Sequence, residues 1–78
     1  MKYIVKHNIP LLDYKNEVKF PESHRKDALF RFHQIERKCF KAGYPVESNV
    51  VAGGFKPLRA TLKVEVDSFT YYAELYAQ

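Results

Sequence analysis

Apolar and polar residues follow two different periods along this chain, and the change lies near residue 45. In the first region, apolar residues recur at spacings of three and four, which at about 100° per residue places them on one side of an α-helix. The predicted buried stripe comprises Ala28, Phe32, Ile35, Cys39 and Ala42, with Leu29 and Phe40 on its flanks. We therefore expect one amphipathic helix over about residues 22–42.

The residues at both ends of this segment favour the same helix. Pro21, Glu22 and Ser23 precede it, and proline and acidic residues suit the first turn of a helix. Gly43 follows the last turn, where a left-handed backbone is common, and Pro45 cannot continue the helix. The helix is therefore expected to end just before this glycine.

From Val46 onward, apolar and polar residues alternate, as they do in a strand with one buried face. A two-residue turn at Asp67-Ser68 places the apolar positions of the last two segments opposite one another. The predicted pairs are Val66 with Phe69, Val64 with Tyr71, Leu62 with Ala73 and Ala60 with Leu75. Because the pattern and the turn agree, we predict an antiparallel hairpin over residues 59–76.

The segment Val46–Ala52 is expected to form a third strand beside this hairpin. A two-residue turn at Gly53-Gly54 turns its apolar residues away from the apolar face of the hairpin, whereas one extra residue brings them onto it. We therefore predict a three-residue loop or a bulge, with three residues on the apolar side: Val46, Ser48 and Val50.

Lys2–His7 mixes apolar and charged residues and is expected to form a short strand. The segment Leu11–Phe20 is ambiguous, because residues 14–17 resemble a turn and only Val18–Phe20 favour a strand. We predict a single compact α+β domain over residues 1–78, in which the helix packs on one face of a small antiparallel sheet of three to four strands.

The composition favours a folded chain in a reducing compartment. Twelve of the 78 residues are Phe or Tyr, and disordered chains are poor in aromatic residues. Cys39 is the only cysteine, so an internal disulfide is excluded and a cytoplasmic location is expected. The chain has no apolar run typical of a signal peptide or a membrane span, so we expect no membrane partner.

The charge imbalance is concentrated on the outward side of the predicted helix. The chain has 13 Lys and Arg against 9 Asp and Glu, a formal net charge of +4. Six basic residues against two acidic ones on this side of residues 24–41 give the same difference: Arg25, Lys26, Arg31, Arg37, Lys38 and Lys41 against Asp27 and Glu36. This side of the helix is therefore the first candidate for contacting a partner.

Phe30 lies among these cations, about 180° from the buried stripe. An exposed ring beside Arg and Lys has the composition of a binding hot spot, and it is also able to stack on a base. Two alternatives are an ordinary solvated helix face and a ring covered by an N-terminal segment such as Leu11-Leu12. The candidate partner surface comprises Lys26, Phe30, Arg31, Arg37, Lys38 and Lys41, with His33 on its flank.

A secondary candidate is the sheet face that points away from the helix, with Arg59, Lys63, Tyr72 and Tyr76. The predicted register puts Lys63 opposite Tyr72 and Arg59 opposite Tyr76. Basic residues between aromatic residues suit the stacking of bases, although the RNA-binding consensus motifs are absent. Cross-strand Tyr and Lys pairs also stabilise sheets that bind no ligand.

Catalytic and metal-binding chemistry has little support in the sequence. His24 and His33 are nine residues apart, which places them on opposite sides of the helix, so they cannot share a metal ion. Cys39 is predicted to point into the core. Gly53-Gly54 is followed neither by the Lys-Ser or Lys-Thr pair nor by the helix of a phosphate-binding loop. We therefore expect no metal, no cofactor and no enzymatic activity.

These observations favour a small non-enzymatic binding protein, a regulator or inhibitor that docks on a larger protein or nucleoprotein complex. Small size alone suggests an accessory protein of a phage or mobile element. The alternative is direct nucleic-acid binding by the basic helix and the Tyr/Lys sheet face, and a remote alternative is a small ribonuclease toxin that uses His24 or His33. A homodimer that closes the outer sheet face is a further arrangement to test.

Overall fold

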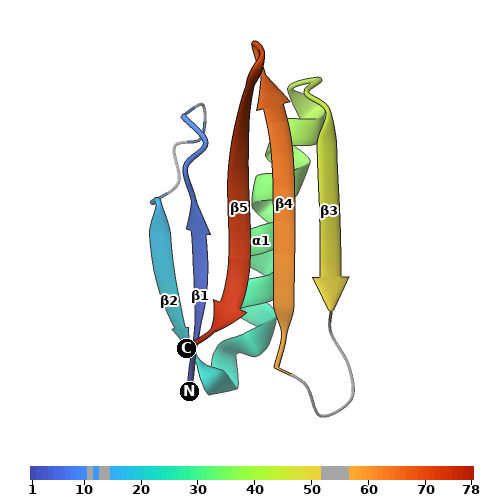
Figure 1. Ribbon diagram of the computed structural model, residues 1–78. Helices are drawn as coiled ribbons and strands as arrows, with labels where there is room; N and C mark the ends of the chain where they lie inside the picture. Colours follow the sequence, from blue (N-terminus) through green and yellow to red (C-terminus); the bar gives the residue numbers. More distant parts are fainter. Residues whose placement is uncertain (11, 13–14, 52–56) are drawn as a thin grey trace.

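The computed structural model describes residues 1–10, 12, 15–51 and 57–78. Within them, one α-helix packs on one face of a five-stranded antiparallel sheet with the strand order β2-β1-β5-β4-β3 (Figure 1). The elements are β1 (Lys2–His7), β2 (Glu17–Pro21), a 3-10 turn η1 (Glu22–His24), α1 (Arg25–Lys41), β3 (Val46–Val51), β4 (Arg59–Val66) and β5 (Phe69–Ala77).

The predicted α+β class is confirmed, but the sheet has one strand more than the predicted three to four. The additional strand is β2, which pairs with β1 and places Val18 opposite Val5. In turn, β1 pairs with β5 and places Ile4 opposite Tyr76. β1 and β2 therefore extend the sheet of the hairpin. Each is stabilised by pairing with a strand that is distant in the sequence, and the local sequence pattern does not reveal this pairing.

The predicted hairpin is confirmed in its register. Its described pairs include Val66 with Phe69 and Ala60 with Leu75. Asp67 and Ser68 form the turn with φ angles of +49° and +72°. Positive φ at both central residues is the backbone of a type I′ turn, whose twist matches that of the two strands.

The apolar side of β3 is also as predicted, because Val46, Ser48 and Val50 lie opposite the apolar residues of β4. The last described pair of this ladder is Val51 with Arg59. The predicted loop or bulge itself falls on residues 52–56, outside the described residues. Immediately before β4, Leu58 is 1% exposed and belongs to the core.

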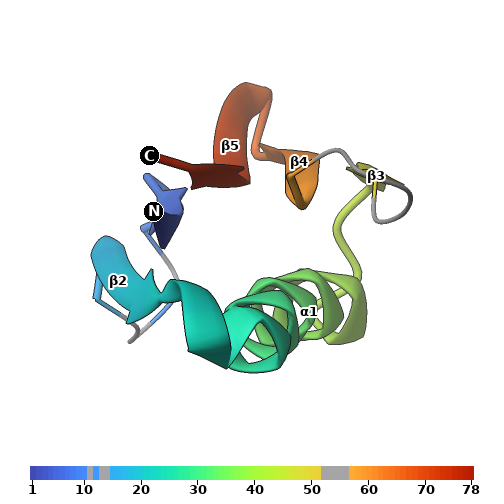
Figure 2. The same ribbon diagram turned by 90° about the horizontal axis from the view of Figure 1, so that it is seen from below.

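The inner side of α1 supplies the centre of the core. Ala28, Phe32 and Cys39 are fully buried, and Ile35 is 1% exposed. Viewed along the strands, the sheet forms an arc and α1 closes its open side (Figure 2), so that the helix contacts all five strands. Within the described residues, no helix is long and apolar enough to cross a membrane.

Two residues predicted for the buried side of the helix are exposed. Ala42 lies beyond the last helical residue, Lys41, and the chain turns away at Gly43 with φ +86°, as expected for a glycine that ends a helix. Phe40 is 75% exposed, although its position was predicted to flank the core. It lies beside β3, the edge of the sheet, where the sheet extends no further to cover the ring.

The end of β1 is held by polar contacts that the sequence did not indicate. The buried His7 accepts a hydrogen bond at Nδ1 from the backbone N–H of Ile9, at 3.1 Å. Asn8 Oδ1 accepts one from the backbone N–H of Tyr72, at 2.8 Å. These bonds fix the position at which the chain leaves the sheet, and they allow Ile9 and Leu12 to enter the core.

Candidate partner surface

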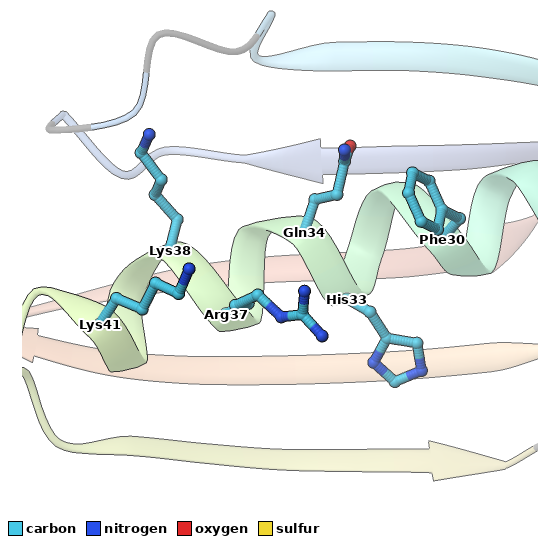
Figure 3. Close-up of a pocket in the computed structure, with 6 residues that line it drawn as sticks. All are labelled: Phe30, His33, Gln34, Arg37, Lys38 and Lys41. Atoms are coloured by element: carbon cyan, nitrogen blue, oxygen red, sulfur yellow. The ribbon is translucent and has the colours of Figure 1, made fainter.

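The outward face of α1 contains a shallow furrow of about 480 Å³ (Figure 3). Its lining residues come from successive turns of the helix: Phe30, His33, Gln34, Arg37, Lys38 and Lys41. Residues three and four apart are neighbours on a helix surface, so this spacing brings the side chains together without any contribution from another element. The furrow therefore belongs to α1 alone.

The furrow has two rows of side chains with different chemistry at its two ends. Phe30, Gln34 and Lys38 follow one side, and the other side begins at His33 and continues through Arg37 and Lys41 (Figure 3). At a rise of about 1.5 Å per residue, the distance from Phe30 to Lys41 along the axis is about 16 Å. One end is thus aromatic and the other end is cationic.

Phe30 is exposed, as its angular position predicts. Its exposed fraction is 64%, whereas Phe32, two residues later on the inner side, is fully buried. The alternative that Leu12 covers Phe30 is wrong, because Leu12 is 7% exposed and packs within the core. Leu11 lies outside the described residues. The fold thus leaves an aromatic ring in water, at a substantial cost in unburied apolar area.

The furrow includes four of the six residues predicted for the partner surface, namely Phe30, Arg37, Lys38 and Lys41. Lys26 is exposed but lies one turn before Phe30, and Arg31 is half-buried outside the furrow. Gln34 was missed, because an uncharged residue adds nothing to a charge pattern. Its position four residues after Phe30 is the signal that identifies it.

The acidic residues of α1 are held near histidines. Glu36 Oε1 lies 3.2 Å from His33 Nδ1, and Asp27 Oδ2 lies 3.5 Å from His24 Nδ1. Across the part of the chain that the structure describes, no carboxylate forms an ion pair with Arg37, Lys38 or Lys41. These three cations are therefore available to an external anion.

The outer sheet face has a different balance of charge. Lys63 lies opposite Tyr72, as predicted, and Tyr72 is 57% exposed. The pairing of Arg59 with Tyr76 is not among the described pairs of the ladder, which ends at Ala60 with Leu75. Five basic residues share this face with four acidic ones: Lys2, Lys6, Lys19, Arg59 and Lys63 with Glu17, Glu47, Glu65 and Glu74. The charges nearly cancel, unlike those of the helix face.

Cys39 lies on the opposite side of α1 from the furrow and is fully buried. Burial raises the pKa of its thiol above the ordinary value, because the charged thiolate is poorly solvated in the core. A thiol in this environment is a poor nucleophile at neutral pH. No group of three or more His, Cys, Asp and Glu residues with metal-binding geometry occurs in residues 1–10, 12, 15–51 and 57–78.

Comparison with known proteins adds no relative from which to transfer a role, since no protein-family model, curated protein or solved structure matches this chain.

Proposed function

We propose that this protein is a small non-enzymatic binding protein that docks on a larger protein or nucleoprotein complex through the furrow of α1. The observation that carries this proposal is the 64% exposure of Phe30 at one end of a furrow whose other end holds Arg37, Lys38 and Lys41. An exposed aromatic ring beside arginine is the composition enriched at the centres of protein interfaces.

The furrow favours a partner segment with an apolar residue and carboxylates about 10 to 16 Å apart, the axial distances from Phe30 to Arg37 and Lys41. The apolar residue packs against Phe30, and the carboxylates accept hydrogen bonds from Arg37 and from the lysines. The guanidinium is the group that binds a carboxylate through two parallel hydrogen bonds, whereas each ammonium acts as a point charge.

A protein partner explains the arrangement better than nucleic acid does. Binding to nucleic acid depends mainly on the number of phosphates neutralised, and the three cations of the furrow contact few of them. The outer sheet face, the other surface considered for nucleic acid, has almost as many acidic as basic residues. Phe30, in contrast, has a direct use in a desolvated protein interface.

The test compares two double variants in quantitative affinity capture from the native host. Phe30→Ala with Arg37→Glu removes the ring and reverses the central charge of the furrow. Phe69→Ala with Lys63→Glu makes the same chemical changes elsewhere, because Phe69 is 66% exposed and Lys63 lies on the outer sheet face. Circular dichroism and urea unfolding establish that both variants are folded.

We expect the furrow variant to lose the captured partner by at least about 30-fold, which corresponds to about 2 kcal/mol, a typical hot-spot effect. The Phe69 and Lys63 variant is expected to retain it. If both variants retain the captured partner equally, the furrow does not contribute to the interaction. If only the Phe69 and Lys63 variant loses the partner, the interaction belongs to the sheet.

Direct nucleic-acid binding is distinguished by its salt dependence. If a generic oligonucleotide binds the purified protein at low salt, its affinity should fall by about 0.7 to 0.9 log units per log unit of salt for each phosphate contacted. We expect no such binding at physiological salt. If the purified protein binds the oligonucleotide strongly and in a salt-sensitive way, and the furrow variant loses this binding, the partner of the furrow is nucleic acid and not protein.

A further inference from the structure

The two edges of the sheet differ in how well they are protected against pairing with another strand. β2 has five residues that include Lys19 and Pro21, and it continues directly into η1. Short length, lysine and proline are common devices that block an edge. β3 has six residues, Val-Glu-Ser-Asn-Val-Val, with no lysine, no proline and only one charge. The β3 edge is therefore the less protected of the two.

The backbone of β3 offers hydrogen-bonding groups toward this free edge. Pro45 O accepts a hydrogen bond from Glu65 N–H at 3.2 Å, which makes residues 45 and 65 a hydrogen-bonded position of the β3–β4 ladder. These positions alternate along an antiparallel pair. The N–H and C=O groups of Val46, Ser48 and Val50 therefore point away from β4. Within the described residues, no strand pairs with this edge.

We propose that β3 pairs with β3 of a second copy of this chain, antiparallel and across a two-fold axis at Ser48. In this register, Val46 lies opposite Val50 of the second copy and Ser48 lies opposite its equivalent. All three residues then use their outward backbone groups, which gives six hydrogen bonds between the copies. The two sheets become one continuous sheet, with both helices on the same side because the axis is perpendicular to the sheet.

The charges of β3 select this register over its neighbour. An axis at Ser48 places Glu47 opposite Asn49 of the second copy. A shift of the axis to Glu47 would place two glutamates directly opposite each other, which is destabilising, and would leave fewer paired residues. An axis at Asn49 would pair as many residues but would use the outward groups of only Ser48 and Val50 within Val46–Val51, with four hydrogen bonds in place of six. The proposed register thus combines the largest number of hydrogen bonds with no repulsion between like charges.

The side chains next to the edge are self-complementary as well. A hollow between α1 and β3 is lined by Glu36, Arg37, Phe40, Val46 and Ser48. Because Ser48 lies on the proposed axis, the hollow of one copy lies next to the same hollow of the second copy. Phe40, 75% exposed in one copy, then covers Val50 of the other, which is 36% exposed.

A cysteine placed on the proposed axis tests the register directly. In Ser48→Cys, the two sulfur-bearing residues face each other at a hydrogen-bonded position, with Cα atoms about 5.5 Å apart, which suits a disulfide. Asn49→Cys is the matched control, because its equivalents are more than about 7 Å apart in the same register. Cys39 is buried and does not compete for oxidation.

With a glutathione redox buffer, we expect Ser48→Cys to form a covalent dimer at least about 10-fold faster than Asn49→Cys. Equal rates would indicate random collision and overturn the proposed register. The disulfide experiment does not depend on a change in the fold, since Ser48 is exposed and its side chain makes no described hydrogen bond.

Sedimentation of the wild-type chain from about 1 μM to about 1 mM tests the dimer itself, over the range of affinities expected for a small interface. We expect a reversible dimer, and Ser48→Pro to shift it to monomer, because proline removes an outward N–H without removing a bond to β4. A wild-type chain that stays monomeric at the highest concentration would overturn the proposal. A dimer that persists in a folded Ser48→Pro would place the interface elsewhere and overturn it too.

Discussion

The two sides of α1 place the same residue type in opposite environments. Phe32 is fully buried, and Phe30, two residues earlier, is 64% exposed. The inner side is sufficient to explain why the helix forms, since it buries Phe32, Ile35 and Cys39 against the sheet. The outer side contributes little to the fold, so its exposed ring and the three furrow cations, which form no ion pair within the described residues, need a different explanation. The binding role proposed above would supply one.

The largest expected difference between the two sides is in stability. Phe32→Ala removes a fully buried ring and should lower the free energy of unfolding by about 3 to 5 kcal/mol. Phe30→Ala should change it by no more than about 0.5 kcal/mol, as for other exposed sites. Urea unfolding followed by circular dichroism measures both values. A loss of several kcal/mol in Phe30→Ala would mean that the ring is covered in solution, and the distinction between the two sides would fail.

A smaller effect on stability is expected from the ionisation of Cys39, which lies on the inner side of α1. Burial raises the pKa of the Cys39 thiol in the folded chain, while the unfolded chain keeps the ordinary value. The folded state therefore retains the proton to higher pH. Stability should be unaffected below the ordinary thiol pKa and should fall as the pH rises above it, by at most about 1.4 kcal/mol per pH unit for one group.

The control for this titration is Cys39→Ala, compared with wild type in urea unfolding at several pH values. The variant is less stable throughout because of the cavity, but it should lack the additional alkaline loss. If both chains lose stability in parallel, other groups account for the pH dependence and the thiol does not.

The smallest expected effect concerns the cations at the end of the furrow. Lys38 and Lys41 lie in the last turn of α1, where positive charge interacts favourably with the helix dipole. Replacing Lys41 by Ala should therefore lower stability by only about 0.3 to 0.5 kcal/mol at low salt, and by less at high salt. Lys63→Ala on the sheet is the comparison. A salt-independent loss well above this range would assign Lys41 a structural role in place of a binding role.

The helix and the hairpin were predictable because two independent signals agreed in each. The stripe that contains Phe32 coincides with the glycine and proline boundary after the helix, and the alternation around Leu62 coincides with the Asp67-Ser68 turn. β2 was uncertain because Val18–Phe20 is too short to show a period, and its existence depends on pairing with a distant strand.

The candidate site was predictable as far as angular position determines it. Phe30 and Arg37 are exposed because they lie on the side of the helix opposite Phe32. The exposure of Phe40 was not predictable in the same way, since it depends on where the sheet ends beside the helix. A helical period gives the direction of a side chain but not the width of the sheet beneath it.

The contact between Lys2 and Gln78 has a mechanical consequence. Lys2 N–H donates to Gln78 O at 3.1 Å, and Gln78 N–H donates to Lys2 O at 2.8 Å, where the N- and C-terminal residues lie side by side (Figure 1). These residues continue the antiparallel ladder between β1 and β5 in the centre of the sheet. A pulling force applied at the two residues therefore loads this pair first and then each following pair in turn. The sheet should unzip at low force, where a shearing geometry would share the load among all the bonds at once.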